Sequence, residues 1–120
     1  MILIVDDDPE FLRSAVVALQ SDKGVYFASN AADALALLKA MEFSIALIDL
    51  DLPDRTGFEL IEEVRRKHPM VPVIAISAVF SGSALESAKE FGATEVLHKP
   101  VSPAWLKVVS RLRATCRQDS

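Results

Sequence analysis

The sequence predicts an α/β fold, a doubly wound (βα)5 sandwich in which a five-stranded parallel sheet has helices on both faces. Short apolar runs alternate along the chain with longer segments whose apolar residues recur at helical spacing, and there are five of each. The first run, Ile2–Val5, is continuously apolar, which is typical of a strand buried on both faces. Strands that are each followed by a helix lie parallel, because the helix returns the chain to the same end of the sheet.

Boundary signals support the first two strand–helix units. The first strand, residues 2–5, ends in acids, and Asp8 followed by Pro9 is an N-cap with proline at the first helical position. The second strand covers residues 25–28, and Asn30 can cap the helix after it. The apolar stripes of the two helices are Leu12, Ala15, Val16 and Leu19, then Ala34, Leu37, Leu38 and Met41.

The third and fourth units follow the same pattern. The third strand covers residues 44–50, and residues 51–57 form a loop by composition. The next helix buries Leu60, Ile61 and Val64 and ends at His68–Pro69. The fourth strand covers residues 71–77, and Ser83–Glu86 is a capping box that begins the fourth helix.

The fifth unit completes the pattern. Gly92 ends the fourth helix, and the fifth strand covers residues 95–98. Ser102 followed by Pro103 repeats the cap-and-proline signal. The last apolar stripe consists of Trp105, Leu106, Val109 and Leu112.

Length and composition indicate one globular domain over residues 1–120, with a core over 1–115 and a frayed tail over 116–120. The chain has 120 residues, of which 51% are hydrophobic and 25% charged. A chain of this size builds a core without disulfides, and its single cysteine, Cys116, has no partner in the chain. We therefore expect a cytoplasmic protein.

Charge and hydropathy argue against two classes of partner. The chain has 17 Asp and Glu against 13 Lys and Arg, so no broad basic surface is expected for a nucleic acid. The longest uncharged stretch, Pro69–Leu85, is interrupted by Pro72 and Gly82, so we do not expect it to span a membrane. The chain also begins without the cationic segment of a signal peptide. We expect no direct contact with nucleic acid or membrane.

Polar side chains follow the ends of four predicted strands. In a parallel sheet the carboxyl ends lie at one edge, which is where ligands bind. The residues delivered there are Asp6, Asp7 and Asp8, then Asp49 and Asp51, then Ser77, and finally Lys99 and Pro100. Carboxylates that converge in this way repel one another unless a cation lies between them.

These residue types favour a divalent cation and a phosphoryl group. Oxygen ligands, with no cysteine or histidine pair nearby, point to Mg²⁺, or to Mn²⁺ as the alternative. Mg²⁺ in proteins usually keeps waters and phosphate oxygens as ligands. A lysine adds positive charge, a serine donates a hydrogen bond, and an aspartate can form an acyl phosphate. The set is sufficient for phosphoryl transfer.

Four motifs, in this order, lie at the ends of the predicted strands: residues 2–9, Asp49 through Gly57, Ser77–Ala78 and Lys99–Pro100. Together they resemble the receiver domain of two-component response regulators, and the resemblance covers nearly the whole chain. It implies a flavodoxin-like fold with the strand order 2-1-3-4-5. It also implies a signalling phosphoacceptor that is not an enzyme, apart from catalysing its own phosphorylation and dephosphorylation.

The resemblance assigns the catalytic roles. Asp49 would accept a phosphoryl group from a phosphohistidine of a sensor histidine kinase or a phosphotransfer protein. Ser77 would bind a phosphoryl oxygen, and Lys99 would pair with the phosphoryl group. In this family the bond from the lysine to the following proline is usually cis, so a cis Lys99–Pro100 peptide is predicted.

The resemblance also assigns the Mg²⁺ ligands. Asp7 would bind the ion directly, Asp6 mainly through water, and Asp51 through its backbone carbonyl, and Asp49 would complete the set of metal-binding residues. Asp8 is interpreted as a helix cap, and residues 54–56 are interpreted as loop.

Phosphorylation would shift a two-state equilibrium that an output domain or partner protein reads on the face of the fourth strand, fifth strand and last helix. A phosphorylation-dependent homodimer through the same region stays open. Receivers commonly have an aromatic residue three positions before the lysine, and here that position is Val96. The aromatic half of the usual switch is therefore absent. Val79 and Asp51 occupy positions that tune the lifetime of the acyl phosphate in this family.

Two other functions compete with this one. Asp49–Asp51 after an apolar strand also resembles the opening motif of haloacid-dehalogenase-type phosphatases. In those enzymes the metal-binding acids follow the lysine, whereas here no acid follows Lys99 until Asp119. A receiver that keeps the fold without being phosphorylated is the second alternative, and Val96 is its only support.

Overall fold

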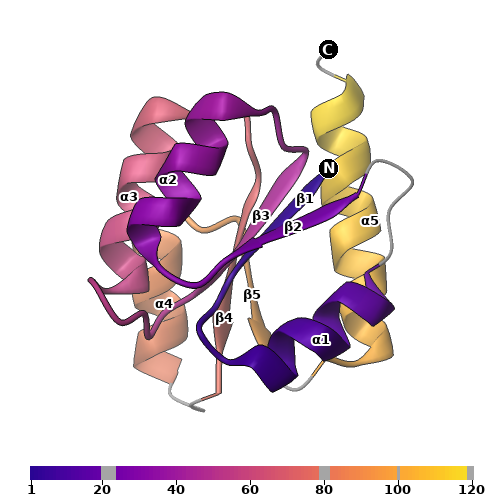
Figure 1. The fold of residues 1–120 in the computed structure, drawn as a ribbon, viewed down its shortest axis with the longest axis horizontal. Coiled ribbons are helices and arrows are strands. Elements are labelled where there is room, and N and C mark those ends of the chain that lie inside the picture. Colours follow the sequence, from indigo (N-terminus) through magenta and orange to yellow (C-terminus); the bar gives the residue numbers. More distant parts are fainter. Residues whose placement is uncertain (20–23, 79–81, 100, 119–120) are drawn as a thin grey trace.

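In the computed structural model the chain forms a five-stranded parallel sheet with helices on both faces (Figure 1). The structure describes residues 1–19, 24–78, 82–99 and 101–118. Side chains of 82–85 and 115–118 are excluded from that description. The strands are β1 (Ile2–Val5), β2 (Val25–Ala28), β3 (Ile45–Asp49), β4 (Val73–Ser77) and β5 (Glu95–His98). Their spatial order is β2-β1-β3-β4-β5, and every neighbouring pair is parallel. The predicted fold class and strand order are confirmed.

The helices divide between the two faces of the sheet. They are α1 (Pro9–Ala18), α2 (Ala31–Ala40), α3 (Gly57–Lys67), α4 (Gly82–Glu90) and α5 (Pro103–Gln118). One layer consists of α1 and α5, and the other of α2, α3 and α4 (Figure 1). Alternate residues of β1 enter the two cores: Leu3 and Val5 pack under α2 and α3, whereas Ile2 and Ile4 pack under α1 and α5. Burial on both faces is what the continuous apolar run predicts.

The predicted helix boundaries are largely confirmed. Asp8 caps α1 by accepting a hydrogen bond from Glu10 N at 3.0 Å, and Asn30 caps α2 by accepting one from Asp33 N at 2.8 Å. Gly92 ends α4 with φ +120°, a left-handed conformation that favours glycine. Local sequence signals therefore set most of these ends.

A few predicted positions were wrong. Leu106 is 44% exposed, because Trp105, Val109 and Leu112 define the buried face of α5 and Leu106 lies about 100° around the helix from Trp105. The strand β4 begins at Val73 rather than at 71, since Pro72 has no N–H to donate to the ladder. Helix α4 begins at Gly82, one residue before the expected cap, a shift typical of helix ends.

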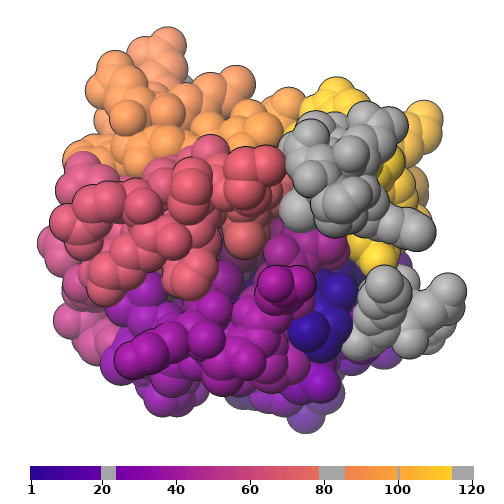
Figure 2. Space-filling model, turned by 90° about the horizontal axis from the view of Figure 1, so that it is seen from above, coloured from indigo at the N-terminus to yellow at the C-terminus, as the bar shows by residue number. Residues whose placement is uncertain are grey.

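The first residues lie at the end of the molecule that is seen from above in Figure 2, where indigo atoms lie among purple ones. There the Met1 carbonyl accepts hydrogen bonds from Ser44 N at 2.9 Å and from Ser44 Oγ at 3.0 Å. Within the described residues, no helix is long and apolar enough to cross a membrane.

Candidate functional site

The carboxyl ends of four strands meet at one edge of the sheet and bring together most of the predicted site. Val5 of β1 lies in register with Ile48 of β3, so the residues that follow them, Asp6 and Asp49, are neighbours. The strand register therefore brings these two carboxylates together, as the sequence predicts for a parallel sheet. The residues brought to this edge are Asp6, Asp7, Asp49, Ser77 and Lys99.

Three carboxylates cluster at this edge. Asp6, Asp7 and Asp49 each offer one oxygen, and these oxygens lie within 4.8 Å of one another. Asp6 and Asp49 are buried, whereas Asp7 is exposed. The pKa of Asp49 is raised to about 6, mainly because burial disfavours its charged form and secondly because Asp6 lies nearby.

Lys99 supplies the positive charge for the two buried acids. Its Nζ lies 2.5 Å from Oδ2 of Asp6 and 3.5 Å from Oδ2 of Asp49. The same ammonium lies 4.5 Å from the centre of the Phe11 ring of α1, a cation–π contact. Burial by itself lowers the pKa of Lys99, but contact with Asp6 and the charge of Asp49 outweigh it and raise the pKa. The lysine is therefore held charged in the centre of the site.

Ser77 and Lys99 lie side by side because β4 and β5 are paired. Ser77 is buried at the end of β4 in register with His98, and Lys99 N donates a hydrogen bond to the Ser77 carbonyl at 3.0 Å. The main chain thus fixes the spacing between the predicted phosphate-binding serine and the lysine.

Asp51 joins the site through its main chain. Its N–H donates a hydrogen bond to Oδ1 of Asp49 at 3.3 Å, and its side chain is exposed. Asp51 also forms an isolated bridge with Thr56 across the loop between β3 and α3. In the described part of the chain its carboxylate is not one of the clustered acids, and the predicted ligand was its carbonyl.

The donor set fits a hard divalent cation. Its three carboxylates belong to Asp6, Asp7 and Asp49, and the exposed Asp7 leaves the cluster open on one side. Oδ2 of Asp6 is buried, and its charge is compensated by the ammonium of Lys99 at 2.5 Å. Oxygen ligands with one open side are suited to Mg²⁺.

Other predicted positions take different places. Asp8 caps α1, as interpreted from the sequence, although its N–H also donates a hydrogen bond to Oδ1 of Asp6 at 2.9 Å. Val96 is partly buried against the core under α2, α3 and α4. Val79 and the peptide bond between Lys99 and Pro100 lie outside the described residues.

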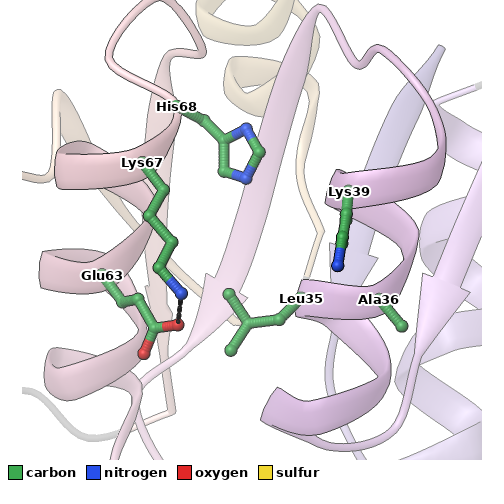
Figure 3. A pocket seen from close by; sticks show the side chains of 6 residues that line it. All are labelled: Leu35, Ala36, Lys39, Glu63, Lys67 and His68. Carbon is green, nitrogen blue, oxygen red and sulfur yellow. Dashed lines mark hydrogen bonds and ion pairs between the residues drawn. The ribbon is translucent and has the colours of Figure 1, made fainter.

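A separate groove lies between α2 and α3, with a volume of about 470 Å³ (Figure 3). It contains none of the predicted site residues. Lys39 and Lys67, near the C-terminal ends of the two helices, line it, and Lys67 pairs there with Glu63. Because both helices run back from the site edge, this groove lies toward the opposite edge of the sheet.

Sequence reasoning missed one residue near the site. Asp54, interpreted only as loop, accepts hydrogen bonds from the main chain of Ala31 and Ala32 at the start of α2. No local signal marks such a contact, because its partners lie more than 20 residues earlier in the chain.

Known proteins share both the sequence pattern and the fold. The family description that matches residues 2–111 is the response regulator receiver domain. A response regulator receiver protein of Anaeromyxobacter sp. is 38% identical over 102 residues, which make up 83% of this chain and 42% of that protein. The response regulator protein PilR of Pseudomonas aeruginosa is 35% identical over 100 residues, 82% of this chain and 22% of that protein. The chain thus spans less than half of either relative.

A solved structure agrees with the fold in detail. The crystal structure of a CheY-like response regulator receiver domain protein from Methanospirillum hungatei has a TM-score of 0.84 at 32% identity. The match covers 98% of this chain and 96% of that one. With the acids of β1 and β3, the serine of β4 and the lysine after β5 at one sheet edge, the chain belongs to the family of response regulator receiver domains.

Proposed function

We propose that this chain is a single receiver domain, residues 1–120 with a core over 1–115, that acts in a two-component phosphorelay. In this proposal Asp49 accepts a phosphoryl group from a phosphohistidine of a sensor histidine kinase or a phosphotransfer protein. One observation carries it: the buried Asp49 carboxylate lies beside the acids Asp6 and Asp7 and 3.5 Å from the ammonium of Lys99. A carboxylate nucleophile among groups that bind a cation and a phosphate is suited to forming an acyl phosphate.

The chemical step is an exchange of bonds at phosphorus. A carboxylate oxygen of Asp49 forms the new O–P bond, and the N–P bond of the phosphohistidine breaks. The imidazole nitrogen keeps the electron pair and takes a proton from solvent. Asp49 must be ionised to attack, and its pKa of about 6 leaves it ionised at neutral pH. No redox partner is required.

Receiver domains bind a divalent metal at their acidic pocket, and here we propose Mg²⁺, or Mn²⁺ as the alternative. Asp7 would bind it directly, Asp6 mainly through water and Asp51 through its carbonyl, with Asp49 completing the set of metal-binding residues. When bound, the ion would neutralise the clustered carboxylates and coordinate phosphoryl oxygens. Asp7 is exposed, so the cluster is open on the side from which a phosphodonor must approach.

Lys99 and Ser77 would change partners on phosphorylation. Before it, the ammonium of Lys99 pairs with Asp6 and Asp49. After it, the ammonium would pair with a phosphoryl oxygen, and the hydroxyl of Ser77 would donate a hydrogen bond to another. Since Val96 replaces the usual aromatic residue, the signal would pass mainly through movement of the main chain around β4 and β5.

Response regulator receiver domains interact with histidine kinases and output domains. We propose that the output domain or partner protein binds the face of β4, β5 and α5, where a phosphorylation-dependent homodimer could also form. We further propose a cytoplasmic protein with no direct contact to nucleic acid or membrane, in keeping with its net charge of -4 and single cysteine.

Intact mass spectrometry with acetyl phosphate tests the proposed function. We expect one phosphoryl addition that requires Mg²⁺ and is absent in Asp49→Asn. The matched control is Asp8→Asn, because Asp8 caps α1 beside the site and is not among the clustered acids. Failure of the folded wild-type protein to gain a phosphoryl group would favour a receiver that works without phosphorylation. Repeated release of phosphate from a small phosphomonoester would instead indicate a phosphatase.

A further inference from the structure

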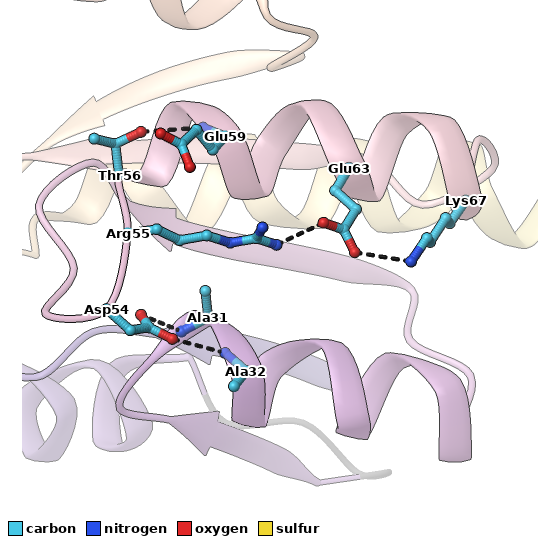
Figure 4. A network of polar contacts seen from close by, with 8 residues as sticks. All are labelled: Ala31, Ala32, Asp54, Arg55, Thr56, Glu59, Glu63 and Lys67. Atoms are coloured by element: carbon cyan, nitrogen blue, oxygen red, sulfur yellow. Dashed lines mark hydrogen bonds and ion pairs between the residues drawn. The ribbon is translucent and has the colours of Figure 1, made fainter.

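Asp54, in the loop between β3 and α3, contacts the start of a different helix. Its Oδ1 accepts a hydrogen bond from Ala31 N at 2.9 Å, and its Oδ2 accepts one from Ala32 N at 3.0 Å (Figure 4). The first N–H groups of a helix have no partners inside the helix. Asn30 already accepts the hydrogen bond from Asp33 N, so Asp54 supplies acceptors for two further N–H groups at this helix end, those of Ala31 and Ala32.

The same loop has two further attachments. Arg55 Nη2 lies 2.6 Å from Oε1 of Glu63 on α3, and Oε2 of Glu63 lies 2.9 Å from Nζ of Lys67 (Figure 4). Leu52 is buried in the core under α2 and α3. Three residues of one short loop, Leu52, Asp54 and Arg55, therefore attach it to the core and to two helices.

The two polar attachments differ in their partners. Arg55 is paired with the side chain of Glu63, and water and salt screen such an ion pair where it is exposed. Asp54 instead accepts hydrogen bonds from main-chain N–H groups at the positive end of a helix, where a carboxylate is favoured. The pKa of Asp54 is lowered chiefly by its hydrogen bond from Ala31 N, which agrees with this stabilisation of the charged form. Although its side chain is exposed, Asp54 is thus the residue that joins this loop to the start of α2.

The loop reaches the phosphoacceptor through Asp51. Asp51 N donates a hydrogen bond to Oδ1 of Asp49 at 3.3 Å, and Asp51 bridges to Thr56 two residues beyond Asp54. A displacement of the loop would therefore move both the amide that contacts Asp49 and the carbonyl proposed to bind Mg²⁺.

We propose that Asp54 is a positioning residue for the metal and phosphoryl site. By attaching the loop to the start of α2, it holds the main chain of Asp51 in the place that Asp49 and a bound Mg²⁺ require. This inference rests on the proposed function, since it assigns Asp54 a part in the same site. Asp54 itself touches neither the clustered carboxylates nor the phosphoryl group.

The test compares Asp54→Ala with Asn30→Ala. Each substitution removes a cap at the same helix end, so both are expected to lower the melting temperature by about 3–6 °C. Only Asp54→Ala is expected to weaken Mg²⁺ binding, with Kd rising roughly tenfold in a calorimetric titration without phosphodonor. Asp54→Asn, which keeps one acceptor oxygen, should lie between the wild type and Asp54→Ala.

Phosphorylation supplies a second measurement. With acetyl phosphate, the Mg²⁺ concentration for half-maximal rate should rise in Asp54→Ala by the same factor as the Mg²⁺ Kd. At saturating Mg²⁺ the variant should recover most of the wild-type rate. A purely structural role would lower the melting temperature without moving this Mg²⁺ dependence. Should Asp54→Ala fail to fold, Asp54→Asn provides the same comparison.

Two results would overturn the inference. One is a Mg²⁺ Kd for Asp54→Ala within twofold of the wild type. The other is an equal loss of Mg²⁺ affinity in Asn30→Ala. Binding of Mg²⁺ by a wild-type protein that gains no phosphoryl group would overturn the proposed function alone, because the comparison of Mg²⁺ affinities would still decide the role of Asp54. A wild-type protein that binds no Mg²⁺ would overturn both.

Discussion

The ionisation of Asp49 opposes the folded state. Burial and the charge of Asp6 raise its pKa from 3.8 to about 6, and Lys99 compensates only in part. The unfolded chain therefore releases this proton more readily than the folded protein does. Holding an ionised Asp49 destabilises the metal-free fold, and an added cation at the cluster would relieve that cost.

The raised pKa of Asp49 predicts how stability depends on pH. Below about pH 3.8 both the folded and the unfolded state keep the proton of Asp49, so this group does not lower the stability of the fold. Between pH 3.8 and about 6 only the unfolded state releases the proton, so stability falls as pH rises. Above about pH 6 the loss is complete and amounts to at most about 3 kcal/mol. Asp49→Asn should therefore be about 1–3 kcal/mol more stable than the wild type at pH 8 and little different at pH 4.

Urea unfolding in EDTA at pH 4, 6 and 8 measures this difference. Glu62→Gln, which alters an exposed acid of α3, is the control and should show no such trend. An Asp49→Asn variant that is no more stable than the wild type at pH 8 would contradict the prediction.

The junction of β3 and α3 is the element boundary on which the site depends most closely. Gly57 begins α3, and its N–H donates a hydrogen bond to the Leu50 carbonyl at 3.0 Å. A Cβ at Gly57 would overlap the carbonyl oxygen of Asp49 and the Cα of Leu50. Glycine is therefore required here for close approach of two main chains rather than for a special φ.

We expect Gly57→Ala to disturb the site and the fold together. The added methyl must push against the end of β3, which should cost about 2–4 kcal/mol of unfolding free energy and weaken Mg²⁺ binding. Gly24→Ala is the matched control: its φ of +99° strains an alanine, but its Cβ would meet only Tyr26 Cε1 at 3.6 Å. Chemical unfolding and a Mg²⁺ titration of both variants would measure the effects on stability and on Mg²⁺ binding. An effect of Gly57→Ala on Mg²⁺ no larger than that of Gly24→Ala would refute this role for Gly57.

Strands and helices differ in how well the sequence predicted their burial. The helical stripes were largely correct, because one periodic pattern fixes one buried face. The strand β2 was predicted from its apolar residues, yet Tyr26 and Phe27 are 40% and 57% exposed. The reason is that β2 is an outer strand, and the position of a strand in a sheet does not follow from its own residues.

At the scale of the whole molecule, Mg²⁺ should act as a stabilising ligand. A ligand that binds only the folded protein raises its stability by about 2.7 kcal/mol at a concentration of 100 times Kd. We expect MgCl₂ to raise the melting temperature, EDTA to reverse the rise, and NaCl of equal ionic strength to have a smaller effect. Asp7→Asn should abolish the Mg²⁺ effect and leave metal-free stability nearly unchanged, because Asp7 is exposed. A rise in Asp7→Asn equal to that of the wild type would exclude Asp7 as a ligand.

The sequence by itself determined the five strand–helix units, and with them the set of side chains at the carboxyl edge of the sheet. Each unit is marked by local signals, such as the continuous run Ile2–Val5 and the caps Asp8 and Asn30. Since parallel strands must place their carboxyl ends together, local order along the chain was sufficient to bring Asp6, Asp49, Ser77 and Lys99 to one edge.

Only the tertiary structure decided how those side chains are compensated and supported. It placed Lys99 between Asp6 and Asp49 and over the ring of Phe11, and it brought Asp54 to the start of α2. These contacts join residues far apart in the chain, and they depend on strand register and on which loops meet in space. Periodicity and capping signals extend over only a few neighbouring residues, so they cannot encode such contacts.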